Sequence, residues 1–431
     1  MLICENVKLR GEYDVIVAGG GVAGVAAAVA AGRKGKHVLL IEKSTKLGGL
    51  ATLGLINLFV PMCNGKGKQV IKGLAEEMLR LAIRYGYNTL PEDFLGGEIP
   101  EDKLLKYSKA GKKPPRYMSR FSADIFALAL TELCVDSNVE IMFDSLVTKV
   151  VKSNDDSSFI TGLVVENKSG SCVCCGRMYV DATGDADILR RVGVPIKRRG
   201  AYHTYMGMKI DLSTCATAIE KKNIGFATKY ICAGKANLYG KGHPADMPLY
   251  DGTDDKDINR YIIQNQIELL RELGTDPAFT DIVALPGMVQ FRTSCCIEGN
   301  YTLCETDVNK HYPDSIGAIC DFDRRGCLFE IPFGTLVHDK YSNVITAGRT
   351  ASADGYAWDV LRVIPPAIIT GQAAGTACVH AIDEDCSINE IDVFYLQEDL
   401  ASQGVLIHFD DNDADACYED EHESNDSCVD E

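Results

Sequence analysis

Near its N-terminus the chain carries the stretch Glu12-Tyr-Asp-Val-Ile-Val-Ala-Gly-Gly-Gly-Val-Ala-Gly24. The β-branched and apolar residues before Gly19 predict a buried strand, and the alanine-rich segment that follows, to about Lys34, predicts a helix. A second apolar run, His37-Val-Leu-Leu-Ile41, predicts another strand, which ends at Glu42. A strand, a G-x-G-x-x-G loop, a helix, a strand and an acidic residue, in that order, indicate a dinucleotide-binding βαβ unit.

Each glycine of this loop has its own role in such a unit. Gly19 permits the tight turn, Gly21 lets the backbone approach a pyrophosphate, and Gly24 allows close packing of the helix. The first amides of the helix, at Val22 and Ala23, meet the phosphate charge at the positive end of the helix dipole. We therefore expect this loop to bind the pyrophosphate of a dinucleotide.

Glu42 lies 18 residues beyond Gly24, close to the spacing of ~20 at which an acidic residue binds the ribose diol. The residues after it are Lys43 and, slightly further on, Leu47-Gly-Gly-Leu-Ala-Thr52. That segment puts a second glycine pair just after the acid, where a longer cofactor needs more backbone contact. At this point the chain resembles the FAD-dependent oxidoreductases that have a glutathione-reductase-like flavin fold.

Two later segments carry the same resemblance. Val180-Asp-Ala-Thr-Gly-Asp185 resembles the second flavin motif of that family, a strand that ends in A-T-G. Asn343-Val-Ile-Thr-Ala-Gly-Arg349 resembles the last motif, in which a strand delivers a Gly-polar pair to the ribityl chain. The family often has Gly-Asp or Gly-Glu at that point, so Arg349 is expected to contact the pyrophosphate instead.

The resemblance implies one non-covalently bound FAD per chain. Together with Arg362-Val-Ile-Pro365 and Gly371-Gln-Ala-Ala-Gly375, the motifs are similar to a bacterial subgroup of unassigned substrate, over about Asp14 to Ile407. In the family, the backbone of the residue that matches Val147 contacts the adenine. The residues expected to bind the cofactor are Gly19, Gly21, Val22, Ala23, Gly24, Glu42, Lys43, Gly48, Gly49, Thr52, Val147, Ala182, Thr183, Gly184, Gly348, Arg349, Val363 and Ile364.

We expect an α/β protein in which a Rossmann-like FAD-binding domain carries an inserted antiparallel β-meander and a second, α+β substrate or cap domain. The first part of the FAD-binding domain spans residues 1–197, and its segment 87–121 is expected to be a flap over the cofactor. Residues 198–337 have no second strand-glycine-helix unit and are assigned to the cap, whereas residues 338–409 return to the FAD-binding domain. The acidic residues 410–431 are expected to be a disordered tail.

Local patterns predict individual elements as well. Apolar spacing predicts a helix over Lys68–Gly86, a second helix that Ser122 caps, and a capped amphipathic helix over Asp254–Gly274. Turn residues at Asn154–Ser158 and Lys168–Gly170 separate three antiparallel strands of the meander.

Composition limits the functional classes. The net charge is −17, but Asp410–Glu431 holds 11 acidic residues and no Lys or Arg, which leaves −6 for the remainder. A nucleic-acid partner, which requires a clustered basic face, is not expected. Without an export signal or a run of ~18 uncharged apolar residues, we expect a cytoplasmic protein that has no membrane partner. The 17 cysteines are then expected to stay free thiols, and their spacing predicts no metal site.

Four residues are candidates for the chemistry. Arg362, just before a proline-led late helix, either favours negative charge on the flavin, holds a substrate carboxylate, or forms a structural ion pair. Cys63 either reaches the flavin or is a buried free thiol. His203, which shares a strand face with Tyr205, is either a proton donor or a structural side chain. Arg292 matches an arginine that recurs in the subgroup and is a candidate substrate contact.

These observations favour an oxidoreductase that transfers a hydride between flavin N5 and a small organic substrate. One alternative is a flavin electron-transfer subunit that acts with an electron-carrier protein. Another is a non-catalytic flavin- or nucleotide-binding module. The sequence has one G-x-G-x-x-G unit in strand-helix context, so a second, NAD(P)-binding domain is not expected. The substrate and the oligomeric state stay open at this point.

Overall fold

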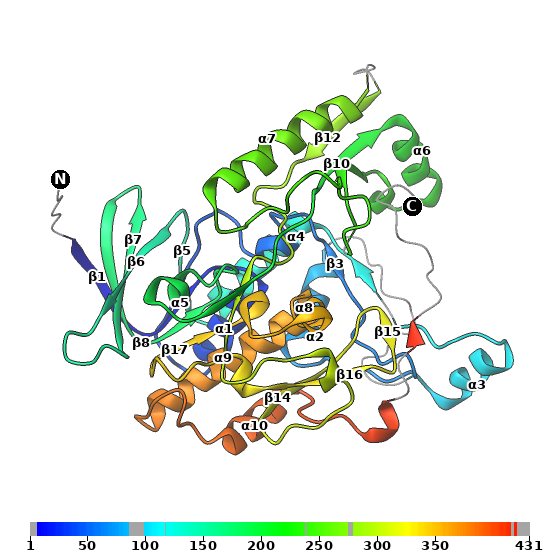
Figure 1. Cartoon of the computed structure of the whole chain (residues 1–431). Coiled ribbons are helices and arrows are strands. Elements are labelled where there is room, and N and C mark those ends of the chain that lie inside the picture. The colour runs from blue at the N-terminus through cyan, green and yellow to red at the C-terminus, as the bar shows by residue number, and fades with distance from the viewer. Residues whose placement is uncertain are drawn as a thin grey trace.

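A seven-stranded sheet forms the framework of the molecule, and its labelled strands lie in the left half of Figure 1. The computed structural model describes residues 7–85, 99–116, 118–237, 239–274, 279–414 and 418–419. The strands lie in the order β5-β2-β1-β8-β7-β6, and β17 pairs with β8. Their bounds are β1 Lys8–Ala18, β2 Val38–Ile41, β5 Val139–Met142, β6 Leu146–Lys152, β7 Ile160–Asn167, β8 Gly170–Asp181 and β17 Val344–Thr346.

Two modes of pairing meet in the long strand β8. Strands β5, β2, β1 and β8 run parallel, and β17 adds a parallel partner to the last residues of β8. The first residues of β8 pair instead with β7, which pairs in turn with β6 in an antiparallel meander. The predicted dinucleotide-binding sheet with an inserted meander is therefore confirmed.

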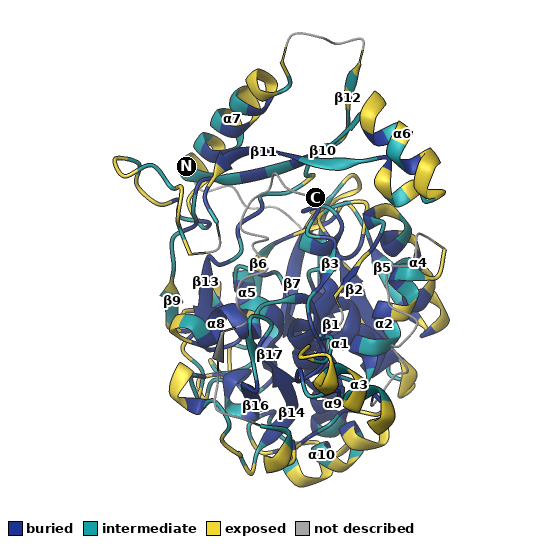
Figure 2. Ribbon diagram, turned by 90° about the vertical axis from the view of Figure 1, so that its right-hand side faces the viewer, coloured by how far each residue is buried: buried dark blue, intermediate teal, exposed yellow. Residues whose placement is uncertain are grey.

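Helices α1 (Val22–Arg33) and α9 (Ile364–Asp383) pack together on one side of the sheet. Their backbones approach closely, because a Cβ placed on Gly371 or Gly375 would lie 2.1 Å from a carbonyl oxygen of α1. The two helices are buried almost throughout, and so are the C-terminal ends of the central strands β1 and β8 (Figure 2). The glycine pair of the late helix is thus a packing motif that holds α9 against the first βαβ unit.

A second layer lies against α9 and belongs to the same core. It consists of the antiparallel strands β14 (Ser315–Cys320) and β16 (Leu328–Pro332) together with α10 (Val393–Ser402). Ile319 and Phe329 are completely buried in the core that also contains α1 and α9. The assignment of residues 198–337 to the cap is therefore wrong at its C-terminal end.

The cap begins and ends at a pair of short strands. The chain leaves the FAD-binding domain through β9 (Ile196–Arg198) and returns through β13 (Cys295–Ile297), which pair antiparallel. Between them the sheet β11-β10-β12 and helix α7 form a separate small core around Tyr261, and helix α6 follows β10 outside this core. The bounds are β10 Thr204–Asp211, α6 Leu212–Lys221, β11 Lys229–Lys235, α7 Asp255–Glu272 and β12 Thr280–Ala284. Helix α7 is capped by Asp254, as the sequence predicts.

The remaining elements surround these layers. Helix α4 starts after its predicted cap Ser122, whereas α2 starts at Leu74 rather than near Lys68, because Gly73 has a φ of +65° and interrupts the helix. The bounds are β3 Leu58–Phe59, α2 Leu74–Ile83, α3 Glu101–Lys109, β4 Ser119–Arg120, α4 Ala123–Asp136, α5 Asp187–Val192, β15 Arg324–Arg325, α8 Gly355–Leu361 and β18 Tyr418–Glu419.

Two segments differ from the expected flap and tail. Of the expected flap, residues 87–98 and 117 lie outside the described residues, but residues 101–109 form α3, which buries none of its residues. The first part of the tail is ordered: Asp413 forms an ion pair with Lys68 at 2.6 Å, and β18 pairs with β15. Basic side chains of the body therefore hold the start of the acidic segment, while residues 415–417 and 420–431 lie outside the described residues.

Among the described residues, no helix is both long and apolar enough to cross a bilayer. One cysteine departs from the expectation of free thiols, because Cys327 is disulfide-bonded. The other cysteines in the described ranges form no disulfide.

Candidate active site

A cavity of about 460 Å³ lies where the carboxyl ends of the parallel strands meet the N-termini of α1 and α9. Such a crevice is the usual ligand site of an open α/β sheet. Of the residues predicted to bind the cofactor, fifteen line the cavity: Gly19, Gly21, Val22, Ala23, Glu42, Lys43, Gly48, Gly49, Val147, Ala182, Thr183, Gly184, Gly348, Arg349 and Ile364.

The glycine loop has the geometry that a phosphate site requires. Gly19 has a φ of +98°, and a Cβ there would lie 2.4 Å from the carbonyl oxygen of Ala182. Gly21, in contrast, has no atom within 4 Å of such a Cβ, so its bare backbone faces open space in the cavity. A Cβ on Gly24 would lie 1.9 Å from the Gly19 oxygen. Gly24 therefore supports helix packing and does not line the cavity, which corrects its place among the binding residues.

Glu42 holds two parts of the cavity wall together. Its Oε2 accepts a hydrogen bond from the Gly20 amide at 2.6 Å, and its Oε1 accepts one from the Ser44 amide at 2.8 Å. The carboxylate is 6% exposed and lines the cavity. Each oxygen has a further lone pair, so the predicted contact with a ribose diol fits this arrangement.

Thr52 and Val363 do not line the FAD cavity but contact residues that do. The Thr52 hydroxyl donates to the Leu47 carbonyl at 2.6 Å and so fixes the turn that carries the second glycine pair. Val363 is the N-cap of α9, and its carbonyl accepts the Ala367 amide at 3.0 Å. Both residues position cavity residues, and the structure does not bring their side chains to the cavity.

Asp181 holds the A-T-G motif in place through hydrogen bonds. This fully buried carboxylate accepts hydrogen bonds from the Thr183 hydroxyl at 2.7 Å and from the Ile188 amide at 2.8 Å. Burial raises the pKa of Asp181 to about 6. By binding both the loop and the first turn of α5, the side chain fixes the loop from Ala182 to Gly184 along the cavity.

Arg349 places a buried cation at the same wall. A Cβ on Gly184 would lie 2.5 Å from its guanidinium carbon, so the absence of a side chain there makes room for the arginine. One amino group, Nη2, pairs with Asp185 at 3.1 Å. Among the described residues, its buried Nε has no hydrogen-bond partner. A cation with an unused donor suits a cofactor that carries a pyrophosphate, so the cavity residues fit FAD.

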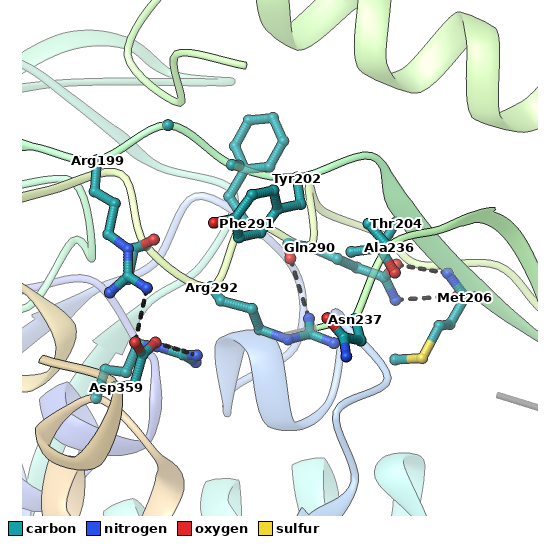
Figure 3. A pocket seen from close by; sticks show the side chains of 14 residues that line it. Arg199, Tyr202, Thr204, Met206, Ala236, Asn237, Gln290, Phe291, Arg292 and Asp359 are labelled. Atoms are coloured by element: carbon teal, nitrogen blue, oxygen red, sulfur yellow. Dashed lines mark hydrogen bonds and ion pairs between the residues drawn. The ribbon is translucent and has the colours of Figure 1, made fainter. Parts of the chain in front are cut away.

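A second cavity, of about 240 Å³, lies between the cap sheet and α8 (Figure 3). Arg362 lines both cavities, so the two share a wall at this residue. The lining residues are Arg199, Gly200, Ala201, Tyr202, Thr204, Met206, Ala236, Asn237, Gln290, Phe291, Arg292, Thr293, Asp359 and Arg362.

Arg362 belongs to a group of three charges, in which Arg362 and Asp359 are buried and the Arg199 side chain is 30% exposed. Its Nε and Nη2 donate to one oxygen of Asp359 at 2.9 and 2.8 Å, and Arg199 pairs with the other oxygen at 2.7 Å. The side chains of Arg362 and Asp359 are 7% and 4% exposed. Burial lowers the pKa of Arg362, and Asp359 opposes that effect. The predicted ion pair is present, and it stands beside the FAD cavity.

Gln290 and Arg292 connect the cap to the FAD-binding domain. The Gln290 amide group donates to the Gly54 carbonyl at 2.7 Å and to the Met206 carbonyl at 3.0 Å. Arg292 donates from Nη1 to the Gln290 carbonyl at 3.0 Å. The predicted substrate contact Arg292 thus lies in the second cavity, on a segment that is tied to both domains.

Cys63 and His203 do not lie in either cavity. Burial raises the pKa of the Cys63 thiol to about 12, so the nucleophilic thiolate is disfavoured. His203 is buried in the cap, with Nδ1 2.8 Å from the Tyr250 hydroxyl and Nε2 3.0 Å from Glu268. Both side chains are buried among other groups of the protein, and neither lines a cavity. This position favours the alternatives in which Cys63 is a buried free thiol and His203 is a structural side chain.

Sequence reasoning missed several cavity residues. Gly287 and Met288 line the FAD cavity and belong to the cap loop, residues 285–294 between β12 and β13. The Gly287 amide donates to the Leu53 carbonyl at 2.8 Å. Asp359 also went unnoticed, although its spacing of three residues from Arg362 is that of a helical ion pair. That spacing was the available signal, whereas no local pattern marks Gly287 and Met288.

The sheet order, the glycine loop and the acidic residue together define a flavin-binding protein of the dinucleotide-binding fold. A family model described as FAD dependent oxidoreductase matches residues 14–224 and 254–400. The chain therefore belongs to this family of enzymes and binds FAD. Comparison with curated proteins gave no match.

Solved structures resemble the chain at low identity. A p-nitrophenol 4-monooxygenase from Pseudomonas putida is 14% identical, with a TM-score of 0.48, and the match covers 91% of this chain and 84% of that one. A geranylgeranyl bacteriochlorophyll reductase-like protein from Thermoplasma acidophilum is 13% identical, with a TM-score of 0.42 and coverages of 93% and 94%. At these scores the neighbours carry no argument about the substrate.

Proposed function

We propose that this FAD-dependent oxidoreductase transfers a hydride between the flavin and a small organic molecule held in the second cavity. FAD, when bound, supplies a carrier that accepts or donates two electrons. The observation that supports the proposal is the position of Arg362, which lines both cavities. A molecule in the smaller cavity therefore contacts the same residue as the cofactor.

The protein supplies positive potential at this shared wall. In the first turn of α9 the Ile364 amide has no partner within the helix, whereas Pro365 and Pro366 carry no N–H group. The positive end of the helix dipole and the Arg362 guanidinium both favour negative charge in the cavity. This arrangement suits a cofactor whose negative charge increases on reduction.

The cap loop positions and encloses a small molecule in the second cavity. Gln290 joins the cap strand β10 to the segment after the second glycine pair, through its bonds to Met206 and Gly54. A cap fixed in this way holds a small molecule in one orientation and excludes water from it. Oriented binding of this kind is the main contribution that protein groups make to hydride transfer.

Anaerobic photoreduction of the purified holoprotein tests the proposal. We expect the reduced flavin to be reoxidised by small organic acceptors, such as a quinone, faster than in a blank without acceptor. In an Ala236→Phe variant, which fills the second cavity, this reaction should slow while the FAD content is unchanged. Ala216→Phe, on the exposed face of α6, is the matched control. Reoxidation by a protein electron carrier alone would overturn the proposal and favour an electron-transfer subunit.

A further inference from the structure

We propose that the second cavity binds a small organic carboxylate with an apolar body. The inference rests on the proposed function, because it names the substrate class of that same cavity. Its basis is the charge of the lining, which contains three arginines and one acidic residue, Asp359. Of these arginines, Arg199 and Arg362 both pair with that one carboxylate.

The single carboxylate of the lining is already engaged. One oxygen of Asp359 accepts from Arg362 and the other from Arg199. Two guanidinium groups therefore share one negative charge, which leaves a surplus of positive charge beside the buried Arg362, whereas the Arg199 side chain is 30% exposed. A buried charge surplus is costly unless a ligand balances it.

Arg362 also has a donor group that Asp359 does not use. Its Nε and Nη2 are used by Asp359, whereas its Nη1 makes no hydrogen bond or ion pair within the described part of the chain. The side chain is 7% exposed and lines the cavity. A ligand carboxylate can accept from this group at the wall that adjoins the FAD cavity.

Arg292 adds a third guanidinium from the opposite segment. Its bond from Nη1 to the Gln290 carbonyl holds the side chain across the cavity, and Figure 3 shows it between the Arg199–Asp359 pair and Asn237. The planar guanidinium matches a carboxylate in geometry as well as in charge. Arg292 is thus a residue that determines specificity for an anion.

The remaining lining has apolar residues beside the polar Thr204, Asn237, Gln290 and Thr293, and the space is small. Tyr202, Met206 and Phe291 contribute aromatic and thioether surface, and Ala201 and Ala236 keep room free. A volume of about 240 Å³ equals roughly eight water molecules at liquid density. The occupant therefore has on the order of ten non-hydrogen atoms, of which the body is apolar and one end is a carboxylate.

Ligand titration of the holoprotein tests this inference without turnover. The probes are benzoate and its neutral isostere benzamide, and the readouts are the visible spectrum of bound FAD and calorimetric affinity. We expect benzoate to bind about ten- to hundred-fold more tightly than benzamide, because charge-assisted hydrogen bonds exceed neutral ones. Equal affinities for the two probes would overturn the inference.

A variant of Arg292, with a matched control, tests whether this residue causes the preference for benzoate. Arg292→Met keeps the apolar stem and should remove most of the preference for benzoate, while benzamide binds as before and FAD content stays unchanged. Arg292→Lys should restore part of the preference. The control is Arg198→Met, an exposed arginine that pairs with Asp251 outside the cavity. An undiminished preference in Arg292→Met would contradict the assignment.

Failure of this inference and failure of the proposed function give different results. If benzamide binds as well as benzoate but organic acceptors reoxidise the flavin, the anion site is refuted and the oxidoreductase reaction stands. If benzoate binds selectively but no organic acceptor reacts, the anion site stands and hydride transfer is refuted.

Discussion

Replacement of Arg362 by methionine should change both the stability of the protein and the reduction potential of its flavin. The substitution keeps much of the apolar stem and removes two hydrogen bonds to Asp359. Breaking a buried ion pair costs about 3–5 kcal/mol. Because Arg199 still pairs with Asp359, the lower end of that range, about 3 kcal/mol, is expected.

The expected change in melting temperature follows from the size of the chain. An unfolding entropy of about 2 cal/mol/K per residue gives roughly 0.9 kcal/mol/K for 431 residues. A loss of about 3 kcal/mol therefore lowers Tm by about 3 °C. Calorimetry of the holoprotein at saturating FAD measures this shift.

Measurement of the flavin reduction potential distinguishes a structural role of Arg362 from a role in stabilising charge on the cofactor. If the Arg362 charge acts on the flavin, Arg362→Met lowers the potential, by about 30 mV for each 1.4 kcal/mol in a two-electron couple. Asp359→Asn, which leaves the arginines less neutralised, should raise it. Both variants lower Tm, and the double variant should cost less than the sum of the single ones. Unchanged potentials in both single variants would refute the cofactor role and leave a structural ion pair.

Three further outcomes are expected. Glu42→Ala should weaken FAD binding about ten- to hundred-fold, since it removes the predicted ribose contact; unchanged affinity in a titration would contradict this. Gly375→Leu should destabilise the holoprotein strongly, because a Cβ there lies 2.1 Å from the Ala27 carbonyl oxygen, and a thermal melt measures the loss. A chain ending at residue 409 should melt below one ending at residue 414, because Lys68 loses its 2.6 Å pair with Asp413. Equal melting temperatures, measured in reducing buffer, would show that the start of the tail adds nothing.

Much of the FAD site could be predicted because its residues act through their own backbone. Gly21 needs no partner to present a bare amide segment, and Glu42 needs only the end of a strand to reach a ribose. Local sequence therefore specifies both. Gly24 and Thr52 have the right motif positions but act behind the wall, since one makes room for helix packing and the other closes a turn. A motif predicts where the chain approaches a cofactor. It does not distinguish the residues that contact the cofactor from those that hold the contacting residues in place.

The second cavity could not be predicted, because four separate segments form it. Arg199 follows β9, Asn237 follows β11, Arg292 precedes β13, and Arg362 follows α8. Only the docking of the cap on the FAD-binding domain brings them together. The same reason explains the error in the cap boundary: the pairing of β9 with β13 is a contact between distant segments, and no local pattern marks it.

The shared position of Arg362 implies that anion binding and flavin reduction influence one another. A carboxylate at this residue adds negative charge beside a cofactor that itself gains negative charge on reduction, so it should lower the flavin potential. By linkage, the oxidised protein should bind benzoate more tightly than the reduced protein, and a tenfold difference, about 1.4 kcal/mol, corresponds to about 30 mV. Potentiometry with saturating benzoate, compared with benzamide, measures the effect. If both ligands give the same potential, the Arg362 charge does not connect the two cavities.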